Sequence, residues 1–405
     1  MRILLIHQAF VTPSEGGGTR HYEFAQHCRG KGQEWVIVTS NLNYLTGKPL
    51  PDCRGLFTKQ QVDGLTLLRA YTYPSLHRSF VWRVVSFLSF MVASAWAGLR
   101  AGSIDVVMGT SPPIFQAVSA WLVAALRRRP FLLEIRDLWP EFAIDMGVLT
   151  NPFLIRMSRR LESFLYAHAT HIMVNSPAYR EYLIAKGIPE KKISFISNGV
   201  DPKMFFPEQR GNHIRQSMGL DGKFVVTYAG ALGVANDIPT VLHAAAKLKD
   251  HDGIRFLFVG DGKERENLER LAAEQHLTNV IFAGSRPKAE IPHILAASDA
   301  CMASLQNIPM FTKTYPNKVF DYMAAGRPTI LAIDGVIRQV IEQSGGGIFV
   351  QPGDGQALAD AILYLEQHRD LAKRMGTAAR IYVEKYFDRA RQAEELSTLL
   401  IPLAN

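Results

Sequence analysis

The sequence predicts an α/β protein made of two Rossmann-like domains with parallel sheets that face each other across a cleft. Three observations lead to this prediction. Short, continuously apolar runs alternate with helical patterns along the chain, as expected for parallel strands covered on both faces. A polar stretch separates two series of such runs, which indicates two doubly wound domains. Glycine-bearing loops follow several runs, at the strand ends where such folds bind ligands.

The apolar runs define the predicted strands and the domain boundaries. In the first half they lie near residues 2–8, 35–39, 65–71, 105–109, 131–135, 171–175 and 193–196. In the second half they lie near residues 224–229, 255–259, 280–283, 300–305, 329–332 and 347–350. We therefore predict an N-terminal Rossmann-like domain over 1–201, a linker over 202–222 and a C-terminal Rossmann-like domain over 223–375. The remaining segment, 376–405, is predicted to contain one long amphipathic helix that packs back on the first domain.

The composition favours an anionic partner and a reducing compartment. Lys and Arg number 45 and Asp and Glu number 37, which gives a net charge of +8. No long basic run or RNA-binding aromatic motif is present, so a nucleic-acid partner is disfavoured. The three cysteines, Cys28, Cys53 and Cys301, have neither disulfide nor metal spacing, which fits a cytoplasmic protein.

The most apolar stretch, residues 84–99, has two interpretations. It is shorter than a membrane span requires and contains serines. A core helix and an interfacial helix resting on the cytoplasmic leaflet both remain open, and the flanking Arg83 and Arg100 fit the second.

The segment 317–328 predicts a short helix that binds an anion. Asn317 is a good N-cap, and Gly326 marks the helix end. Lys318 then lies in the first turn, where a cation is unfavourable unless an anion joins it. Asp321 lies on the same face one turn later, so the pair suits a ligand with phosphate and sugar hydroxyls. The alternative is a solvated Lys and a favourably placed Asp.

Two glycine loops are candidate phosphate cradles. Gly16, Gly17 and Gly18 precede a helix expected from about residue 21, and they match neither the dinucleotide fingerprint nor the P-loop. The second loop follows the strand at 224–229, and a helix capped by Asp237 comes after it. Its residues are Gly230, Ala231, Leu232 and Gly233. Ordinary turns are the competing interpretation of both loops.

Three further residues follow strands of the second domain. Gly260 and Gly262 allow close approach by a flat base or by a neighbouring loop. Arg286 follows the next strand and either reaches phosphate or is solvated.

In the first domain, Glu134, Arg136 and Asp137 end a strand and are candidate catalytic residues, with a structural Arg–carboxylate network as the competitor. The D-x-D pattern at 250–252 precedes its strand, away from the expected ligand face, so we expect no metal site there.

Taken together, the motifs resemble glycosyltransferase family 4, a retaining family with the GT-B fold. The resemblance covers nearly the whole chain and extends to bacterial O-antigen, capsule and exopolysaccharide transferases, including the N-acetylfucosamine transferase type. It rests on the Gly16–Gly18 loop, DLWPE at 137–141, residues 175–201, YAGALG at 228–233, FVGDG at 258–262 and NKVFDYMAAGRP at 317–328.

The resemblance implies roles for three parts of the chain. Asp321 matches the second acidic residue of the family's Glu-x7-Glu motif, which holds the donor ribose hydroxyls. Gly230–Gly233 matches the donor diphosphate loop. Gly16–Gly18 matches the loop that approaches the donor phosphates from the first domain.

The chain also departs from the family. Lys313 stands where the motif's first Glu is expected, and Ala231 and residues 236–237 replace a basic pair in the diphosphate loop. The usual His of the first domain is replaced in the run 134–137. The donor phosphates therefore need another cation. Lys318 is our candidate, ahead of Arg286 and Lys313.

The resemblance thus implies a retaining, metal-independent glycosyltransferase without cofactor, with the acceptor side in the domain at 1–201 and the nucleotide sugar in the domain at 223–375. Its donor is a nucleotide-diphosphate sugar, expected to be UDP-linked, and its acceptor is a polyprenyl-diphosphate-linked saccharide at the cytoplasmic membrane surface. Two alternatives remain: a GT-B-fold nucleotide-sugar epimerase or hydrolase, and a non-catalytic nucleotide-sugar-binding partner of another transferase.

Overall fold

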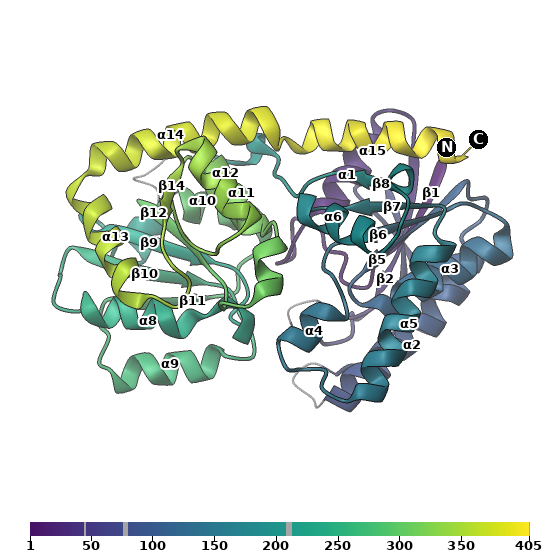
Figure 1. The fold of residues 1–405 in the computed structure, drawn as a ribbon, viewed down its shortest axis with the longest axis horizontal. Helices are drawn as coiled ribbons and strands as arrows, with labels where there is room; N and C mark the ends of the chain where they lie inside the picture. The colour runs from purple at the N-terminus through teal and green to yellow at the C-terminus, as the bar shows by residue number, and fades with distance from the viewer. Residues whose placement is uncertain (44–45, 76–79, 208–212, 405) are drawn as a thin grey trace. The chain divides into compact units, whose positions relative to one another are not determined.

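The computed structural model describes residues 1–43, 46–75, 80–207 and 213–404, which form two compact units (Figure 1). The first unit contains Met1–Thr12, Gly17–Ser197 and Ala390–Asn405. The second contains Pro13–Gly16 and Asn198–Arg389. Each unit is an α/β domain with its own sheet.

The described part of the first unit forms an eight-stranded sheet in the order β3-β4-β2-β1-β5-β6-β7-β8. Its strands are β1 (Arg2–Ile6), β2 (Glu34–Ser40), β3 (Phe57–Val62), β4 (Leu65–Ala70), β5 (Val106–Ser111), β6 (Phe131–Ile135), β7 (His171–Val174) and β8 (Ile193–Phe195). The order reverses between β1 and β5, and ligands in such sheets bind at this switch point, beyond the carboxyl ends of the strands.

The edge strand β3 pairs antiparallel with β4, with Phe57 opposite Ala70. We predicted parallel strands only, and β3 was not predicted at all. Its sequence FTKQQV is largely polar and only partly buried, so it lacks the apolar run of the inner strands.

Helices cover both faces of this sheet. On one face, α1 (Arg20–Arg29) and α15 (Arg389–Ala404) share a core with β1 and β5 that includes Leu5, Phe24 and Leu396. On the other, α2 (Phe80–Leu99), α3 (Ile114–Arg127) and α5 (Pro152–His168) lie side by side (Figure 1). The shorter helices are α4 (Glu141–Asp145), α6 (Pro177–Ala185) and η1 (Glu190–Lys192).

The second unit forms a six-stranded parallel sheet in the order β11-β10-β9-β12-β13-β14. Its strands are β9 (Phe224–Ala229), β10 (Ile254–Val259), β11 (Val280–Gly284), β12 (Ala300–Ser304), β13 (Thr329–Ala332) and β14 (Gly347–Phe349). This is a Rossmann strand order with its switch point between β9 and β12. The predicted class of two α/β domains with parallel sheets is confirmed.

Helices cover both faces of the second sheet as well. One core is formed with α8 (Ile238–Lys247), α9 (Arg265–Glu274) and α13 (Gly355–Gln367). The other is formed with α10 (Ile291–Ala296), α11 (Asn317–Ala324), α12 (Val336–Ser344) and α14 (Arg369–Tyr386). The short helices are α7 (His213–Ser217), η2 (Pro202–Met204), η3 (Val234–Asn236), η4 (Lys288–Glu290) and η5 (Pro309–Lys313).

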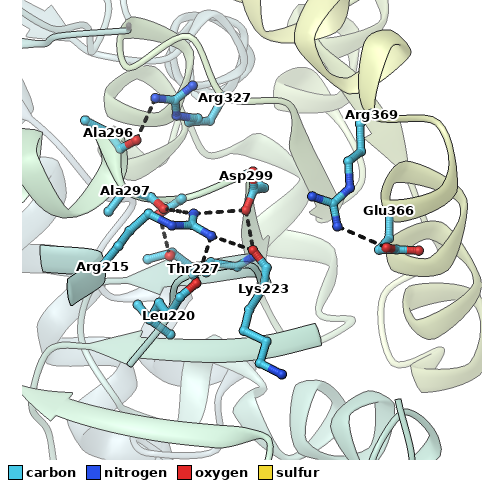
Figure 2. Close-up of polar contacts among 12 residues, drawn as sticks. Arg215, Leu220, Lys223, Thr227, Ala296, Ala297, Asp299, Arg327, Glu366 and Arg369 are labelled. Atoms are coloured by element: carbon cyan, nitrogen blue, oxygen red, sulfur yellow. Dashed lines mark hydrogen bonds and ion pairs between the residues drawn. The ribbon is translucent and has the colours of Figure 1, made fainter. Parts of the chain in front are cut away.

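The described residues of the predicted linker, 202–222, are part of the second unit. Arg215 of α7 is buried, and its guanidinium donates to the Ala297 carbonyl at 2.6 Å and to Asp299 Oδ2 at 3.2 Å (Figure 2). It also donates to the Leu220 carbonyl at 2.9 Å. A buried guanidinium needs such partners, so Arg215 fixes this polar stretch against the domain.

The predicted long terminal helix is interrupted. Helix α14 ends at Tyr386, and α15 begins at Arg389. Between them, the Phe387 carbonyl accepts from Val200 N–H at 3.1 Å, and Arg389 N–H donates to the Val200 carbonyl at 2.8 Å. The Phe387 ring packs 4.6 Å from Phe320. These contacts replace helical hydrogen bonds at the end of the second unit, and the chain from Ala390 onward belongs to the first unit.

Candidate functional site

The loop after β9 lies at the switch point of the second unit. Within the loop, Gly230 N–H donates to the Val259 carbonyl and Leu232 N–H donates to the Asp261 carbonyl, both at 2.9 Å. The amides of Ala231 and Gly233 have no partner among the described residues. The predicted cradle therefore has two amides available to an anion rather than four.

Lys318 reaches this loop from the first turn of α11. A β-carbon at Gly230 would lie 3.0 Å from Lys318 Nζ, so the glycine makes room for the amine. The Nζ atom donates to Tyr228 Oη at 2.6 Å and to Asn236 Oδ1 at 2.9 Å. It also lies 4.1 Å from the centre of the Tyr228 ring. The predicted N-cap is wrong, because Asn317 is already helical and Pro316 is the cap residue.

Both hydrogen-bond partners of Lys318 are neutral. Burial lowers the pKa of the Lys318 amine to about 7, although the side chain keeps some accessible surface. Burial also raises the pKa of Tyr228, so its hydroxyl stays un-ionised near neutrality. Among the described residues no carboxylate forms an ion pair with Lys318. An anion bound at the Gly230 loop would supply the missing countercharge.

Asp321 does not pair with Lys318. Its carboxylate forms an ion pair with Lys288 of η4, with Nζ and Oδ2 2.5 Å apart. Lys288 N–H donates to the Glu15 carbonyl at 3.1 Å, and Ala289 N–H donates to the Pro13 carbonyl at 3.2 Å. The pair thus joins α11 to the segment 13–16, which belongs to the second unit.

Gly260 and Gly262 are explained by loop packing. A β-carbon at Gly260 would lie 1.8 Å from the Gly230 carbonyl oxygen, and one at Gly262 would lie 2.3 Å from that of Leu232. Of the two interpretations given above, the approach of a neighbouring loop is the one that the structure shows. Contact with a nucleobase stays a prediction.

The remaining candidates of this unit take different positions. Arg286 lies 3.6 Å from Glu290 and is partly exposed, so its charge is already balanced. Lys313 ends η5 and is partly buried. Gly16 is buried and belongs to the second unit, whereas Gly17 and Gly18 are exposed and belong to the first. The helix after this loop begins at Arg20.

In the first unit, Glu134 is the centre of a buried charge network at the carboxyl end of β6. It is fully buried, and its Oε1 accepts from Arg20 Nε at 3.0 Å. Its Oε2 contacts His21 Nε2. Burial alone would raise the pKa of Glu134, but His21, Arg20 and Arg136 hold it well below its ordinary value. Both carboxylate oxygens are occupied, so this geometry fits a positioning role better than direct contact with substrate.

His7 follows β1 and lies against His21, with 4.6 Å between their ring centres. Both ring nitrogens of His7 are buried and lack a hydrogen-bond partner among the described residues. Burial lowers the pKa of His7 well below its ordinary value, and Arg136 and His21 add to the shift. His7 is therefore a neutral imidazole near neutral pH.

Arg136 and Asp137 lie beyond the end of β6. Arg136 Nε donates to Thr110 Oγ1 at 2.7 Å, and its Nη2 donates to the Pro112 carbonyl at 3.1 Å. The Asp137 side chain is partly exposed. Burial raises the pKa of the Asp137 carboxyl to about 6, although Arg136 opposes the shift. Asp137 is the carboxylate of this group that remains accessible.

Arg20, His21 and His7 were not among the predicted site residues, although they lie around Glu134. One signal was present: Arg20 and His21 open the helix after a glycine loop, and His7 ends the first strand. The resemblance led us to seek a histidine only in the run 134–137. Across the described residues, no cluster of three or more His, Cys, Asp or Glu side chains is placed to hold a metal ion.

Two family models match the chain. The model described as "Glycosyl transferases group 1" matches residues 211–382, and the model "Glycosyl transferase 4-like domain" matches residues 15–199. The first match therefore lies in the second unit, and the second match lies largely in the first unit.

Individual proteins resemble the chain over longer stretches. The probable glycosyltransferase WbjE of Pseudomonas aeruginosa is 30% identical over 268 residues, which are 65% of this chain and 66% of WbjE. The putative colanic acid biosynthesis glycosyl transferase WcaI of Escherichia coli K12 is 22% identical and aligns over 96% of this chain and 97% of its own. The crystal structure of Anabaena Alr3699/HepE with UDP and glucose has a TM-score of 0.73 at 17% identity, covering 99% of each chain, and shows a shared fold.

Proposed function

Because the chain belongs to the group 1, GT4-like glycosyltransferases, we propose that it transfers a sugar from a UDP-linked donor to a polyprenyl-diphosphate-linked saccharide. The reaction is retaining, needs no metal, and serves assembly of a bacterial surface polysaccharide. The name of WcaI, a relative linked to colanic acid biosynthesis, supports this setting. The UDP and glucose bound to HepE support the donor class.

The observation that carries the proposal is the position of Lys318. Its amine lies beside the Gly230 loop at the switch point of the second sheet, with neutral hydrogen-bond partners. A donor diphosphate at this loop would accept from Lys318 and from the amides of Ala231 and Gly233. Asp321, held by Lys288, is then the acceptor for the ribose hydroxyls.

The reaction uses these groups to stabilise charge on the leaving group. The bond between the anomeric carbon and the diphosphate oxygen breaks, and the bond to the acceptor oxygen forms on the same face of the sugar. The acceptor proton passes to the leaving phosphate oxygen. Negative charge grows on the diphosphate during this step, so the contact with Lys318 strengthens in the transition state.

The first unit supplies the acceptor side in this proposal. Asp137, accessible and ionised above about pH 6, accepts a hydrogen bond from an acceptor hydroxyl. Arg136 attracts the acceptor's phosphates. Glu134 acts through Arg20 and His21 as a positioning residue that fixes the start of α1 beside the Gly17–Gly18 turn.

Calorimetric titration with a panel of UDP-sugars, including UDP-N-acetylfucosamine, tests the donor site. Replacement Lys318→Met should raise the donor Kd roughly 10–150-fold, the range for losing a hydrogen bond to a charged group. The matched control is Lys373→Met, which removes an exposed cation of α14 in the same unit. Equal donor affinities for the two variants would remove Lys318 from the site.

The same variant separates binding from folding. A buried amine whose pKa falls from 10.5 to about 7 destabilises the folded state. This cost is absent above the unfolded pKa, grows as pH falls, and is complete below about pH 7. Lys318→Met should therefore raise the Tm at pH 7 while it weakens donor binding. Release of free sugar without acceptor would indicate a hydrolase or epimerase instead, and binding without turnover would indicate a non-catalytic partner.

A further inference from the structure

Helix α2 is apolar on both its buried and its exposed face. Phe90, Ala93 and Ala97 are buried in the first unit. The opposite face carries Val92, which is 64% exposed, and Trp96, which is 43% exposed. No charged residue occurs between Arg83 and Arg100. A helix that is apolar all round is normally covered on every side, so the outer face of α2 lacks its expected cover.

The apolar surface continues onto α3. Ser119 Oγ donates to the Met91 carbonyl at 2.8 Å, so the two helices are in direct contact. A shallow, mostly apolar groove of about 280 Å³ lies between them, lined in part by Val92, Trp96 and Leu122. Leu126, one turn beyond Leu122, is 61% exposed. We call the surface formed by Val81, Leu88, Val92, Trp96, Leu122 and Leu126 the α2–α3 face.

The charged residues near the ends of α2 and α3 are mostly arginines. Between residues 80 and 129 the sequence contains five arginines and one carboxylate, Asp105. Asp105 is occupied, since its Oδ2 accepts from Arg2 N–H at 2.7 Å. Arg100 packs 4.4 Å from the centre of the Trp96 ring, at the C-terminal end of α2. Arg128 and Arg129 are exposed just beyond α3.

We propose that the α2–α3 face docks on a bilayer surface that contains anionic phospholipid. Apolar side chains, a tryptophan in contact with Arg100 and further arginines at the ends of α2 and α3 match the boundary between acyl chains and phosphate headgroups. A second copy of the chain fits less well, because the arginines of two such faces would repel each other. This proposal rests on the proposed function and deepens it. It names the surface of the protein that would contact the membrane in which the lipid-linked acceptor is held.

The contacts of α2 favour a helix that docks on a membrane surface over one that crosses the membrane. By length and composition, Val81–Leu99 could cross a bilayer, and 39% of this stretch is buried within the structure. Its inner face packs in the first unit and against α3, with the Phe87 and Phe115 rings stacked at 6.1 Å. Spanning would require those contacts to break, whereas surface docking keeps them.

Vesicle flotation of the full chain tests the proposal. We expect flotation with equimolar phosphatidylcholine and phosphatidylglycerol, little flotation with phosphatidylcholine alone, and weaker binding at high salt. The double variant Val92→Ser/Trp96→Ser should lower the partition coefficient at least about ten-fold. Arg128→Gln/Arg129→Gln should lower it about five-fold per arginine. Matched controls are Ile381→Ser on α14 and Arg270→Gln on α9, both exposed positions of the second unit.

Three outcomes would overturn the proposal: no flotation of the wild-type chain, equal flotation of Val92→Ser/Trp96→Ser and Ile381→Ser, or a wild-type dimer that this double variant converts to monomer. Calorimetric donor titration of each variant keeps the two proposals apart. Lost flotation with unchanged donor affinity concerns the α2–α3 face alone, and lost donor binding by the wild type concerns the proposed function. If Val92→Ser/Trp96→Ser does not fold, the flotation of Arg128→Gln/Arg129→Gln, which changes two exposed side chains, still tests the proposal.

Discussion

Each unit places a charged residue near the carboxyl ends of its strands, but the two units balance these charges differently. In the first unit, Glu134 is buried with Arg20 and His21, and both of its carboxylate oxygens have partners without a ligand. In the second, Lys318 is held by Tyr228 and Asn236 and forms no ion pair among the described residues. A balanced buried charge serves the fold, whereas an unbalanced one costs stability and fits a site awaiting an anion.

The largest expected effect concerns the balanced network. Glu134→Gln leaves the guanidinium of Arg20 buried beside a neutral amide, so we expect a loss of about 3–5 kcal/mol in the free energy of unfolding. Denaturant titration followed by circular dichroism measures it. Glu394→Gln, which removes the exposed partner of Lys31, is the control and should leave stability unchanged. Equal stability of both variants would show that the network does not hold the first unit together.

The next effect is the pH dependence of donor binding. Donor phosphate favours protonated Lys318, so binding raises its pKa from the free value of about 7. Donor affinity is then full below pH 7 and falls as pH rises, by up to about ten-fold per unit until the bound pKa is reached. Calorimetry at several pH values measures the donor Kd, in the range where the donor phosphates do not titrate. The donor Kd of Lys318→Met should not change with pH. A sloping profile in that variant would assign the titration to another group.

We expect Asp137 to set the acidic side of the pH–activity profile. Its carboxyl has a pKa of about 6 and is the hydrogen-bond acceptor in our proposal only when ionised. We expect kcat/KM to fall as pH drops below about 6 and expect Asp137→Asn to remove this limb. Initial rates with saturating donor measure it. An unchanged acid limb in Asp137→Asn would exclude the residue from the acceptor side.

The smallest expected effect refines the position of Lys318. Tyr228→Phe removes the 2.6 Å hydrogen bond to Nζ but keeps the ring beneath the amine. This bond positions the amine without touching the donor, so we expect the donor Kd to rise only about 2–12-fold, which corresponds to roughly 0.5–1.5 kcal/mol. A loss as large as that of Lys318→Met would instead mean that the hydroxyl itself contacts the donor.

The fold was predictable because its inner strands carry an unmistakable apolar signal. Runs such as residues 224–229 must be covered on both faces, and their alternation with helices leaves few topologies. The polar edge strand β3 has no such signal in its sequence. It becomes a strand only because it pairs with β4. The break at Phe387 was equally hidden, because it depends on Val200, which is far away in the sequence.

The sequence by itself determined two parallel-sheet domains, the glycine loops after their strands, and Lys318 in the first turn of a helix. These follow from local periodicity, from glycine and from helix-end rules, which act within a few residues. Only the tertiary structure decided which charges meet. It paired Asp321 with Lys288 rather than Lys318, and it enclosed Glu134 with Arg20 and His21. Ion pairing is set by distance in space, and residues 33 to 114 positions apart become neighbours only when the strands assemble.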